Sequence, residues 1–314
     1  MYNKVKKISH GREALVITEL GAYSLSDTLE CGQAFSYTQT VSDGAYKEYI
    51  IPIGDVLLTV GQERLGELIF YGADDEMLDN VIAPYFSLNT DYGKIADTVA
   101  GSYGKPWFKE AVEHAKGIAI LKQDPWETLF SFIVSQNNNI PRIRKILRRL
   151  CLEYGENLAE KSSLEACPLS KHGGTPCREN CGECGVCYSF PKAKDVCECP
   201  EKLLLANPGF RYRYLCDAAA RVNSGETDLS AIEAAHSYAY SLEELKKITG
   251  VGDKVASCVA LFGLGNLDAF PIDVWMKRAI DTYFDGSLDP AVFGEYAGVA
   301  QQYIFHYIRN LENK

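Results

Sequence analysis

The chain has 314 residues, of which 46% are hydrophobic and 24% charged, a globular composition that argues against disorder and suffices for two domains, each with its own core. The formal net charge of −10 excludes a broad electrostatic attraction for polyanions, so any contact with a polyanion must be local. No apolar run reaches the length of a signal peptide or a membrane span, which predicts a cytoplasmic protein without a membrane partner.

Strand-like segments occupy the first part of the chain. Segments 15–18, 46–53, 56–60 and 68–71 are rich in β-branched and aromatic residues, and turn signals at 42–44 and 54–55 separate them. From about residue 74 the apolar residues recur at helical spacing. The predicted fold class is therefore α+β, with an N-terminal antiparallel β-sheet domain over residues 1–115 and an all-helical body over residues 116–314.

Several helix starts are marked in the helical half. Asp124 is a good N-cap and Pro125 a good first helical residue, and Pro141 opens a second helix. Ser241 and Glu244 have the spacing of a capping box. The helix that follows Pro141 has an apolar stripe formed by Ile143, Leu147 and Leu150.

A cysteine-rich insert interrupts the helical half at about residues 160–200. Its densest part has the spacing Cys177-x3-Cys181-x2-Cys184-x2-Cys187. In a reducing compartment such density predicts metal ligands rather than disulfides. We favour structural zinc, with an iron–sulfur cluster as the alternative that these tight spacings also suit.

A glycine hairpin carries the clearest chemical signal. Gly250 and Gly252 allow backbone N–H groups to approach a phosphate, and the helix that follows presents its positive N-terminus to the same anion. Lys254 lies in that first turn, where the helix dipole disfavours a cation and helps to release a neutral amine. Asp273 follows 19 positions later and can return to the amine. Taken singly, Lys254 is explained as a solvated lysine and Asp273 as a helix cap, but together with the hairpin they predict an amine that attacks a sugar carbon.

In order and approximate spacing, the chain resembles the helix-hairpin-helix DNA glycosylases, and among them the 8-oxoguanine DNA glycosylase/lyases. The resemblance covers nearly the whole chain, in segments 32–35, 124–133, 137–142, 250–256, 273–274 and 296–298. It implies a bifunctional enzyme of base excision repair, which flips 8-oxoguanine out of duplex DNA, excises it through a lysine Schiff base and cleaves the abasic site by β-elimination.

The resemblance also implies the roles of individual residues. Lys254 matches the amine that attacks C1′, and Asp273 matches the carboxylate that stabilises positive charge on the sugar. Gly32 matches the position whose carbonyl accepts the N7–H that 8-oxoguanine has and guanine lacks. The remaining base-pocket matches are Cys258, Gln301 and Phe305, each of which would otherwise be explained as a core or surface residue.

A second set of matches concerns the DNA around the extruded base. Asn137 resembles the residue that fills the hole in the stack, and Arg142 and Arg211 resemble the donors to the orphaned cytosine. Phe210 stands where relatives often have tyrosine, and Trp275 where they often have a phosphate-binding histidine. The predicted DNA-binding set is Asn137, Arg142, Phe210, Arg211, Gly250, Gly252 and Trp275.

Two alternatives stay open at this point. One is a related glycosylase that acts on another damaged base, and the other is a non-enzymatic, metal-dependent DNA-binding or redox-sensing module built on the cysteines. In the leading interpretation no cofactor is required for catalysis, and the partner is double-stranded DNA with a damaged base. We expect a monomer in the cytoplasm, associated with the nucleoid when it acts on DNA.

Overall fold

A computed structural model describes residues 2–160 and 185–312, and it has the predicted α+β architecture. A six-stranded sheet has the order β1-β2-β6-β5-β4-β3, and every neighbouring pair is antiparallel. Its strands are β1 (Asn3–Ser9), β2 (Arg12–Thr18), β3 (Thr38–Asp43), β4 (Tyr46–Ile53), β5 (Val56–Gln62) and β6 (Leu68–Tyr71). The four predicted strands correspond to β2, β4, β5 and β6. Both edge strands, β1 and β3, were missed, because β1 is exposed almost throughout and neither strand has a fully buried residue that would mark an apolar face.

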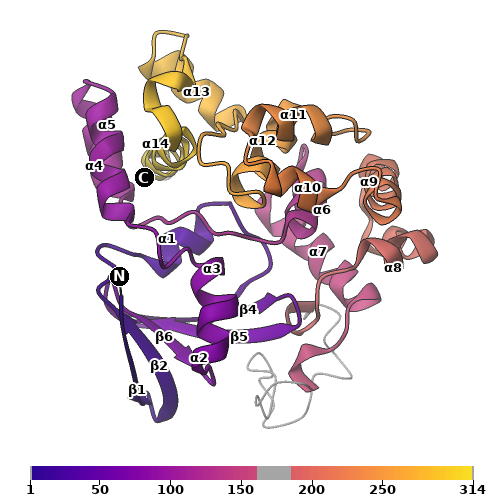
Figure 1. The fold of residues 1–314 in the computed structure, drawn as a ribbon, viewed down its shortest axis with the longest axis horizontal. Coiled ribbons are helices and arrows are strands. Elements are labelled where there is room, and N and C mark those ends of the chain that lie inside the picture. Colours follow the sequence, from indigo (N-terminus) through magenta and orange to yellow (C-terminus); the bar gives the residue numbers. More distant parts are fainter. Residues whose placement is uncertain (1, 161–184, 313–314) are drawn as a thin grey trace.

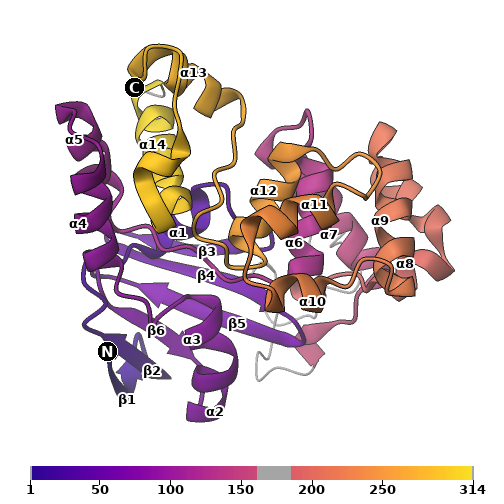
Figure 2. The same cartoon turned by 45° about the horizontal axis from the view of Figure 1, so that its top comes forward.

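Helices form the rest of the molecule and lie mainly on one side of the sheet (Figures 1 and 2). The α-helices are α1 (Leu25–Glu30), α2 (Asp75–Met77), α3 (Ala83–Tyr85), α4 (Tyr92–Ser102), α5 (Pro106–Ala115), α6 (Pro125–Ser135), α7 (Ile140–Tyr154), α8 (Ala193–Glu198), α9 (Tyr212–Ser224), α10 (Leu229–Ala234), α11 (Tyr238–Leu245), α12 (Asp253–Phe262), α13 (Val274–Tyr283) and α14 (Ala297–Glu312). The short η elements are η1 (Leu78–Ile82), η2 (Leu158–Glu160), η3 (Gly185–Cys187), η4 (Pro200–Ala206), η5 (Gly209–Arg211) and η6 (Pro290–Tyr296). None of the helices in the described segments has both the length and the apolarity needed to cross a bilayer.

Two large apolar cores meet along the segment that contains α1. Leu25 and Leu29 of α1 pack in the core under the sheet, whereas Cys31 and Phe35, just beyond the helix, pack in the helical core. The helices α4 and α5 also contribute to the helical core, through residues such as Val99 and Phe108. The domain boundary near residue 115 stays a prediction. The turn after α1 lies where the two cores meet, and this places it beside the helical body.

Local capping signals set several helix boundaries. Asp124 caps α6, because its Oδ1 accepts the Glu127 N–H at 2.8 Å. The predicted capping box at Ser241 was wrong: α11 begins one turn earlier, where Ser237 Oγ accepts the Tyr240 N–H at 3.3 Å. Ser241 is instead buried inside α11 and donates to Asn266 Oδ1 at 3.0 Å. The contact with Asn266, and not a capping role, therefore accounts for Ser241.

The cysteine-rich insert is only partly within the described residues. Cys177, Cys181 and Cys184 lie outside them. Cys187 lies in η3 and is buried in a small core with Ile50 of β4 and Leu57 of β5. Among residues 2–160 and 185–312, no group of three or more His, Cys, Asp or Glu side chains is arranged to hold a metal ion. Metal binding by the four cysteines therefore stays a prediction.

Candidate active site

A cleft of about 730 Å³ brings together residues from distant parts of the chain. Its wall is formed by the turn after α1, the end of α6 and the loop to α7, the first turns of α12 and α13, and one face of α14. Seven of the predicted site residues line this cleft: Gly32, Asn137, Gly252, Lys254, Asp273, Trp275 and Phe305. These residues span most of the sequence, so the tertiary fold creates the cleft.

The glycine hairpin is fixed by α9 before it enters α12. Thr249 donates its backbone N–H to Asp217 Oδ2 at 2.7 Å. Burial opposes ionisation of Asp217, but this bond and Arg221 outweigh it, and the pKa of the carboxyl is lowered. Gly250 has a φ of +83°, and Gly252 is the N-cap of α12. No atom of residues 2–160 or 185–312 would lie within 4 Å of a Cβ built on Gly252, so among these residues nothing blocks a phosphate from the N-terminus of α12.

Lys254 projects from the first turn of α12 into the cleft and is half-buried. Its Nζ donates to Ser135 Oγ at 3.4 Å and lies 4.8 Å from the centroid of the Phe132 ring. Phe132 is itself stacked on Phe262, with 5.6 Å between ring centroids. Lys254 forms no ion pair with any residue that the structure describes. The amine thus contacts one hydroxyl and one aromatic face, and its hydrogen bond with the Cys258 thiol contributes to the pKa of that thiol.

Asp273 lies across the same cleft at the start of α13. Its Oδ1 accepts the Met276 N–H at 2.9 Å, so it is the N-cap of α13. Within the described parts of the chain its Oδ2 makes no hydrogen bond. Asp273 therefore caps a helix and also presents a carboxylate oxygen to the cleft, so it can fill both of the roles considered from sequence.

Two predicted base-pocket residues lie behind the cleft wall. Cys258 and Gln301 are each 3% exposed. Burial raises the pKa of the Cys258 thiol, the Lys254 charge opposes this shift, and Asp273 adds to it. Gln301 Oε1 accepts a hydrogen bond from Gln302 Nε2 at 2.7 Å. The electrostatic coupling places Cys258 close to both catalytic candidates, and contact of either residue with a base stays a prediction.

Gly32 and Phe305 face each other in the cleft. A Cβ built on Gly32 would lie 3.8 Å from Phe305 Cε1, an ordinary van der Waals distance. Glycine is required here by a φ of +91° rather than by crowding. The neighbouring Gln33 fixes the turn, because its buried amide donates to the carbonyls of Thr28 and Ala119, each at 2.8 Å.

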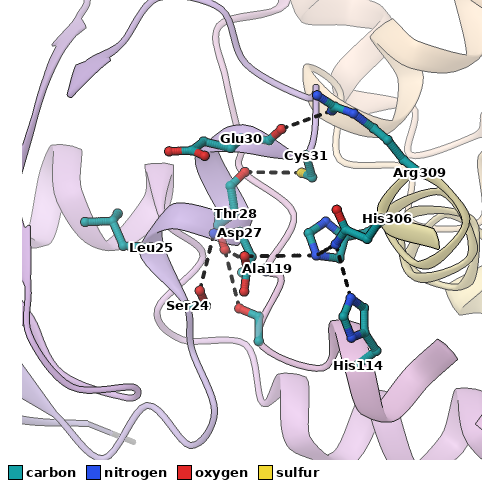
Figure 3. A network of polar contacts seen from close by, with 12 residues as sticks. Ser24, Leu25, Asp27, Thr28, Glu30, Cys31, His114, Ala119, His306 and Arg309 are labelled. Carbon is teal, nitrogen blue, oxygen red and sulfur yellow. Dashed lines mark hydrogen bonds and ion pairs between the residues drawn. The ribbon is translucent and has the colours of Figure 1, made fainter. Parts of the chain in front are cut away.

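A polar network beside the cleft joins α1, α5 and α14 (Figure 3). Arg309 Nη1 donates to the Glu30 carbonyl at 3.3 Å, at the end of α1. His306 Nε2 lies 4.0 Å from Asp27 Oδ1. Burial lowers the pKa of His306; Asp27 opposes this shift, while His114 and Arg309 add to it. The network fixes the turn that contains Gly32 relative to the helix that contains Phe305.

The predicted contacts to the orphaned base cluster beside Asn137. Arg211 is 3% exposed, and its guanidinium donates to the carbonyls of Gln136, Asn137 and Pro208. Burial and then the nearby Arg142 charge lower the pKa of Arg211. Arg142 is exposed, and its guanidinium has no partner within the described segments. Asn137 has a φ of +47°, so Arg211 stabilises an uncommon backbone conformation.

The aromatic residue beside this cluster is available to stack. The Phe210 side chain is 48% exposed, and the Arg211 guanidinium carbon lies 4.5 Å from its ring centroid. On the other side of the cleft, Arg278 lies 5.3 Å from the Trp275 ring centroid. Each ring therefore contacts an arginine and still has part of its surface exposed.

The cleft-lining residues that were not predicted as site residues include Ser135, Lys277 and Arg309. Arg309 could have been found, because it is four residues after Phe305 and shares its helical face. Lys277 could have been found in the same way, as the residue four positions after Asp273 on α13. Ser135 gave no such signal, because its contact with Lys254 crosses 119 residues.

Comparison with known proteins identifies the family. Residues 15–129 match the family described as "8-oxoguanine DNA glycosylase, N-terminal domain". The solved structure of MBOgg1, in complex with a low-affinity DNA ligand, is 32% identical, with a TM-score of 0.81 and coverage of 99% of both chains. The chain belongs to the 8-oxoguanine DNA glycosylase/lyase family.

Other members of the 8-oxoguanine glycosylase/lyase family are also similar to this chain. The Clostridium acetobutylicum 8-oxoguanine glycosylase/lyase, solved with duplex DNA that has cytosine opposite 8-oxoguanine, is 28% identical with a TM-score of 0.80, covering 99% of this chain and 98% of that one. The N-glycosylase/DNA lyase of Saccharomyces cerevisiae is 29% identical over 280 residues, which are 81% of this chain and 66% of the yeast protein. The family resemblance inferred from sequence motifs is confirmed.

Proposed function

We propose that this protein is a DNA glycosylase/AP lyase that excises 8-oxoguanine from double-stranded DNA and then cleaves the abasic site. The observation that carries the proposal is the cleft in which Lys254 and Asp273 lie with Gly32 and Phe305. A nucleophilic amine, a carboxylate, a backbone turn and an aromatic face are the groups that base excision through a covalent intermediate requires. Family membership supplies the substrate class.

Base release begins when the neutral Lys254 amine donates its lone pair to C1′ of the extruded nucleotide. The C1′–N9 bond breaks, and its electron pair leaves with the base, which is then protonated. Positive charge builds on the sugar in the transition state, and the Asp273 carboxylate stabilises it there. Asp273 can do this without losing its helix cap, because Oδ1 caps α13 and Oδ2 makes no other bond in the described structure.

Strand cleavage uses the same covalent bond. The C1′–O4′ bond opens, O4′ takes up a proton, and the nitrogen loses a proton and becomes a Schiff base. The iminium acidifies C2′, so loss of a C2′ proton expels the 3′ phosphate by β-elimination. The N-terminus of α12 at Gly252 is open and positively polarised, which suits it to bind a backbone phosphate beside Lys254.

Recognition of the lesion requires groups on both faces and one edge of the base. The Phe305 ring borders the turn at Gly32 in the cleft, so a base that stacked on this ring would bring its edge to the turn. The Gly32 carbonyl would accept N7–H, which only the oxidised base carries. On the other side of the DNA, Arg142, which has no partner among the described residues, would donate to the orphaned cytosine, and Asn137 lies where it could fill the emptied position in the stack.

Borohydride trapping tests the proposal. The purified protein, incubated with an 8-oxoguanine:cytosine duplex and borohydride, should form a covalent complex, and an undamaged duplex should not. Lys254→Gln should abolish trapping, base release and nicking while leaving fold and duplex affinity largely intact. Base release by Lys254→Gln would refute the nucleophile assignment. A parallel set of duplexes, each with one damaged base, tests whether a related lesion is the preferred substrate.

We also propose that Cys177, Cys181, Cys184 and Cys187 hold a structural zinc ion, with an iron–sulfur cluster as the alternative. The spacing of the four cysteines supports this, and Cys187 lies at the sheet, away from the residues that line the cleft. Elemental analysis of purified protein distinguishes zinc from iron. Cys181→Ser should lower metal content and thermal stability more than it lowers turnover per folded molecule.

A further inference from the structure

Ser135 contacts the amine of Lys254 at the last residue of α6. The Lys254 Nζ donates to Ser135 Oγ at 3.4 Å, and Ser135 lines the same cleft. The Ser135 hydroxyl hydrogen is already used, because Oγ donates to the Phe132 carbonyl at 2.7 Å. A hydroxyl has one hydrogen, so towards Lys254 the Ser135 oxygen can act only as an acceptor.

This direction of donation has a chemical consequence. A neutral primary amine has two N–H bonds and one lone pair. If Ser135 donated its hydrogen to Nζ, it would occupy the lone pair that must form the bond to C1′. Because Ser135 accepts instead, it binds one N–H and does not itself occupy the lone pair. The Phe132 ring, whose centroid lies 4.8 Å from Nζ, limits the movement of the amine on another side.

We propose that Ser135 is a positioning residue, which holds the Lys254 amine through an N–H bond so that its lone pair stays directed into the cleft. The inference rests on the proposed function of Lys254 as nucleophile and goes beyond it, because Ser135 never touches the reacting carbon. Small misplacements of a reacting group can reduce rates by as much as about a hundredfold, so one hydrogen bond of this kind can affect the chemical step. Binding of DNA does not depend on it.

A competing explanation is that Ser135 only terminates α6. Serine near a helix end often bonds to a carbonyl three residues back, and this alone would account for its contact with Phe132. Ser102 provides the matched comparison in this chain. It is the last residue of α4, and its Oγ donates to the Val99 carbonyl at the same distance of 2.7 Å. Ser102 does not line the cleft, so it has the structural contact without the lysine.

The experiment compares Ser135→Thr with Ser135→Val, which have nearly the same shape and differ in the hydroxyl. Single-turnover base release and trapping are measured with saturating enzyme on an 8-oxoguanine:cytosine duplex, together with the Kd for the same duplex without turnover. Ser102→Thr and Ser102→Val serve as the matched pair, and thermal unfolding of all four variants reports folding.

We expect Ser135→Thr to retain a rate within about threefold of wild type and Ser135→Val to be slower by about tenfold or more, with Kd unchanged within about twofold. The Ser102 pair should leave the rate unchanged. Equal rates for the two Ser135 variants would overturn the proposal, and so would a loss of affinity in Ser135→Val that matches its loss of rate. Base release by Lys254→Gln would instead refute the nucleophile itself, so the two failures are distinguishable.

Discussion

The aromatic ring of Tyr214 lies directly against the Cα of Gly250, so that a Cβ added to Gly250 would lie 2.4 Å from Tyr214 Cγ. Gly250 also has a φ of +83°, which disfavours any residue with a Cβ. Tyr214 and Asp217 both project from α9, so this helix packs against the hairpin through one ring contact and one hydrogen bond. The glycine is needed for packing as well as for phosphate approach.

Gly250→Ala should therefore lower the free energy of unfolding by about 2–4 kcal/mol, from backbone strain and overpacking together. Urea denaturation measures the loss. Gly225→Ala is the control, because Gly225 has a similar φ of +78° but a Cβ built on it would meet no atom of the described residues within 4 Å, and it should cost only about 1 kcal/mol. Equal losses at the two sites would show that the Tyr214 contact contributes nothing.

The two arginines beside Asn137 should behave differently. Arg211→Met leaves the buried carbonyls of Gln136 and Pro208 without a donor, so we expect a loss of about 2–4 kcal/mol in unfolding free energy. Arg142→Met removes an exposed side chain and should change stability by less than about 0.5 kcal/mol. In lesion binding, Arg142→Met should reduce the preference for cytosine opposite 8-oxoguanine, measured with duplexes that vary this base. A large stability loss in Arg142→Met would contradict the expected difference between the two arginines.

Glu127 in α6 should make stability depend on pH. Burial raises the pKa of its carboxyl from 4.5 to about 7, a hydrogen bond with Ser36 opposes the shift, and Asp124 adds to it. The folded state thus binds the proton more tightly than the unfolded state. This contribution is fully present below about pH 4.5 and is lost as the pH rises through about 7.

Glu127→Gln removes the ionisation, so the variant should gain stability relative to wild type at pH 8.5, by on the order of 1–2 kcal/mol. The gain should disappear near pH 4.5. Urea denaturation at a series of pH values gives the profile, and Glu113→Gln, at an exposed position on α5, should show no such trend. A gain from Glu127→Gln that does not change with pH would contradict the assignment to this carboxyl.

Lys277 should contribute to DNA binding, because it is exposed and lines the cleft near Trp275, which cannot carry charge. If Lys277 neutralises one phosphate, Lys277→Gln should reduce the slope of log K against log salt by about 0.9. Titration of duplex binding at several salt concentrations measures the slope. Lys6→Gln, on the edge strand β1 where Lys6 pairs with Asp75, should leave it unchanged. An unchanged slope in Lys277→Gln would exclude the contact.

Features that depend on neighbouring residues were predictable from the sequence. The four recognised strands, the start of α6 at Asp124 and the buried stripe of α7 all follow from periodicity and capping within a few residues. The error at Ser241 shows the limit of such signals. Ser237 and Ser241 are one helical turn apart and both fit a cap, and only the contact of Ser241 with Asn266 distinguishes them.

By itself, the sequence determined the fold class, the family motifs and the residues that match the reacting groups. The tertiary structure alone decided how they are arranged: Lys254 donates to Ser135, Arg211 holds the backbone at Asn137, and Cys258 and Gln301 lie behind the cleft wall. The physical reason is range. Helix caps, turns and periodicity are set by residues a few positions apart, whereas these contacts join segments tens to more than a hundred residues apart, and only packing of the two cores brings them together.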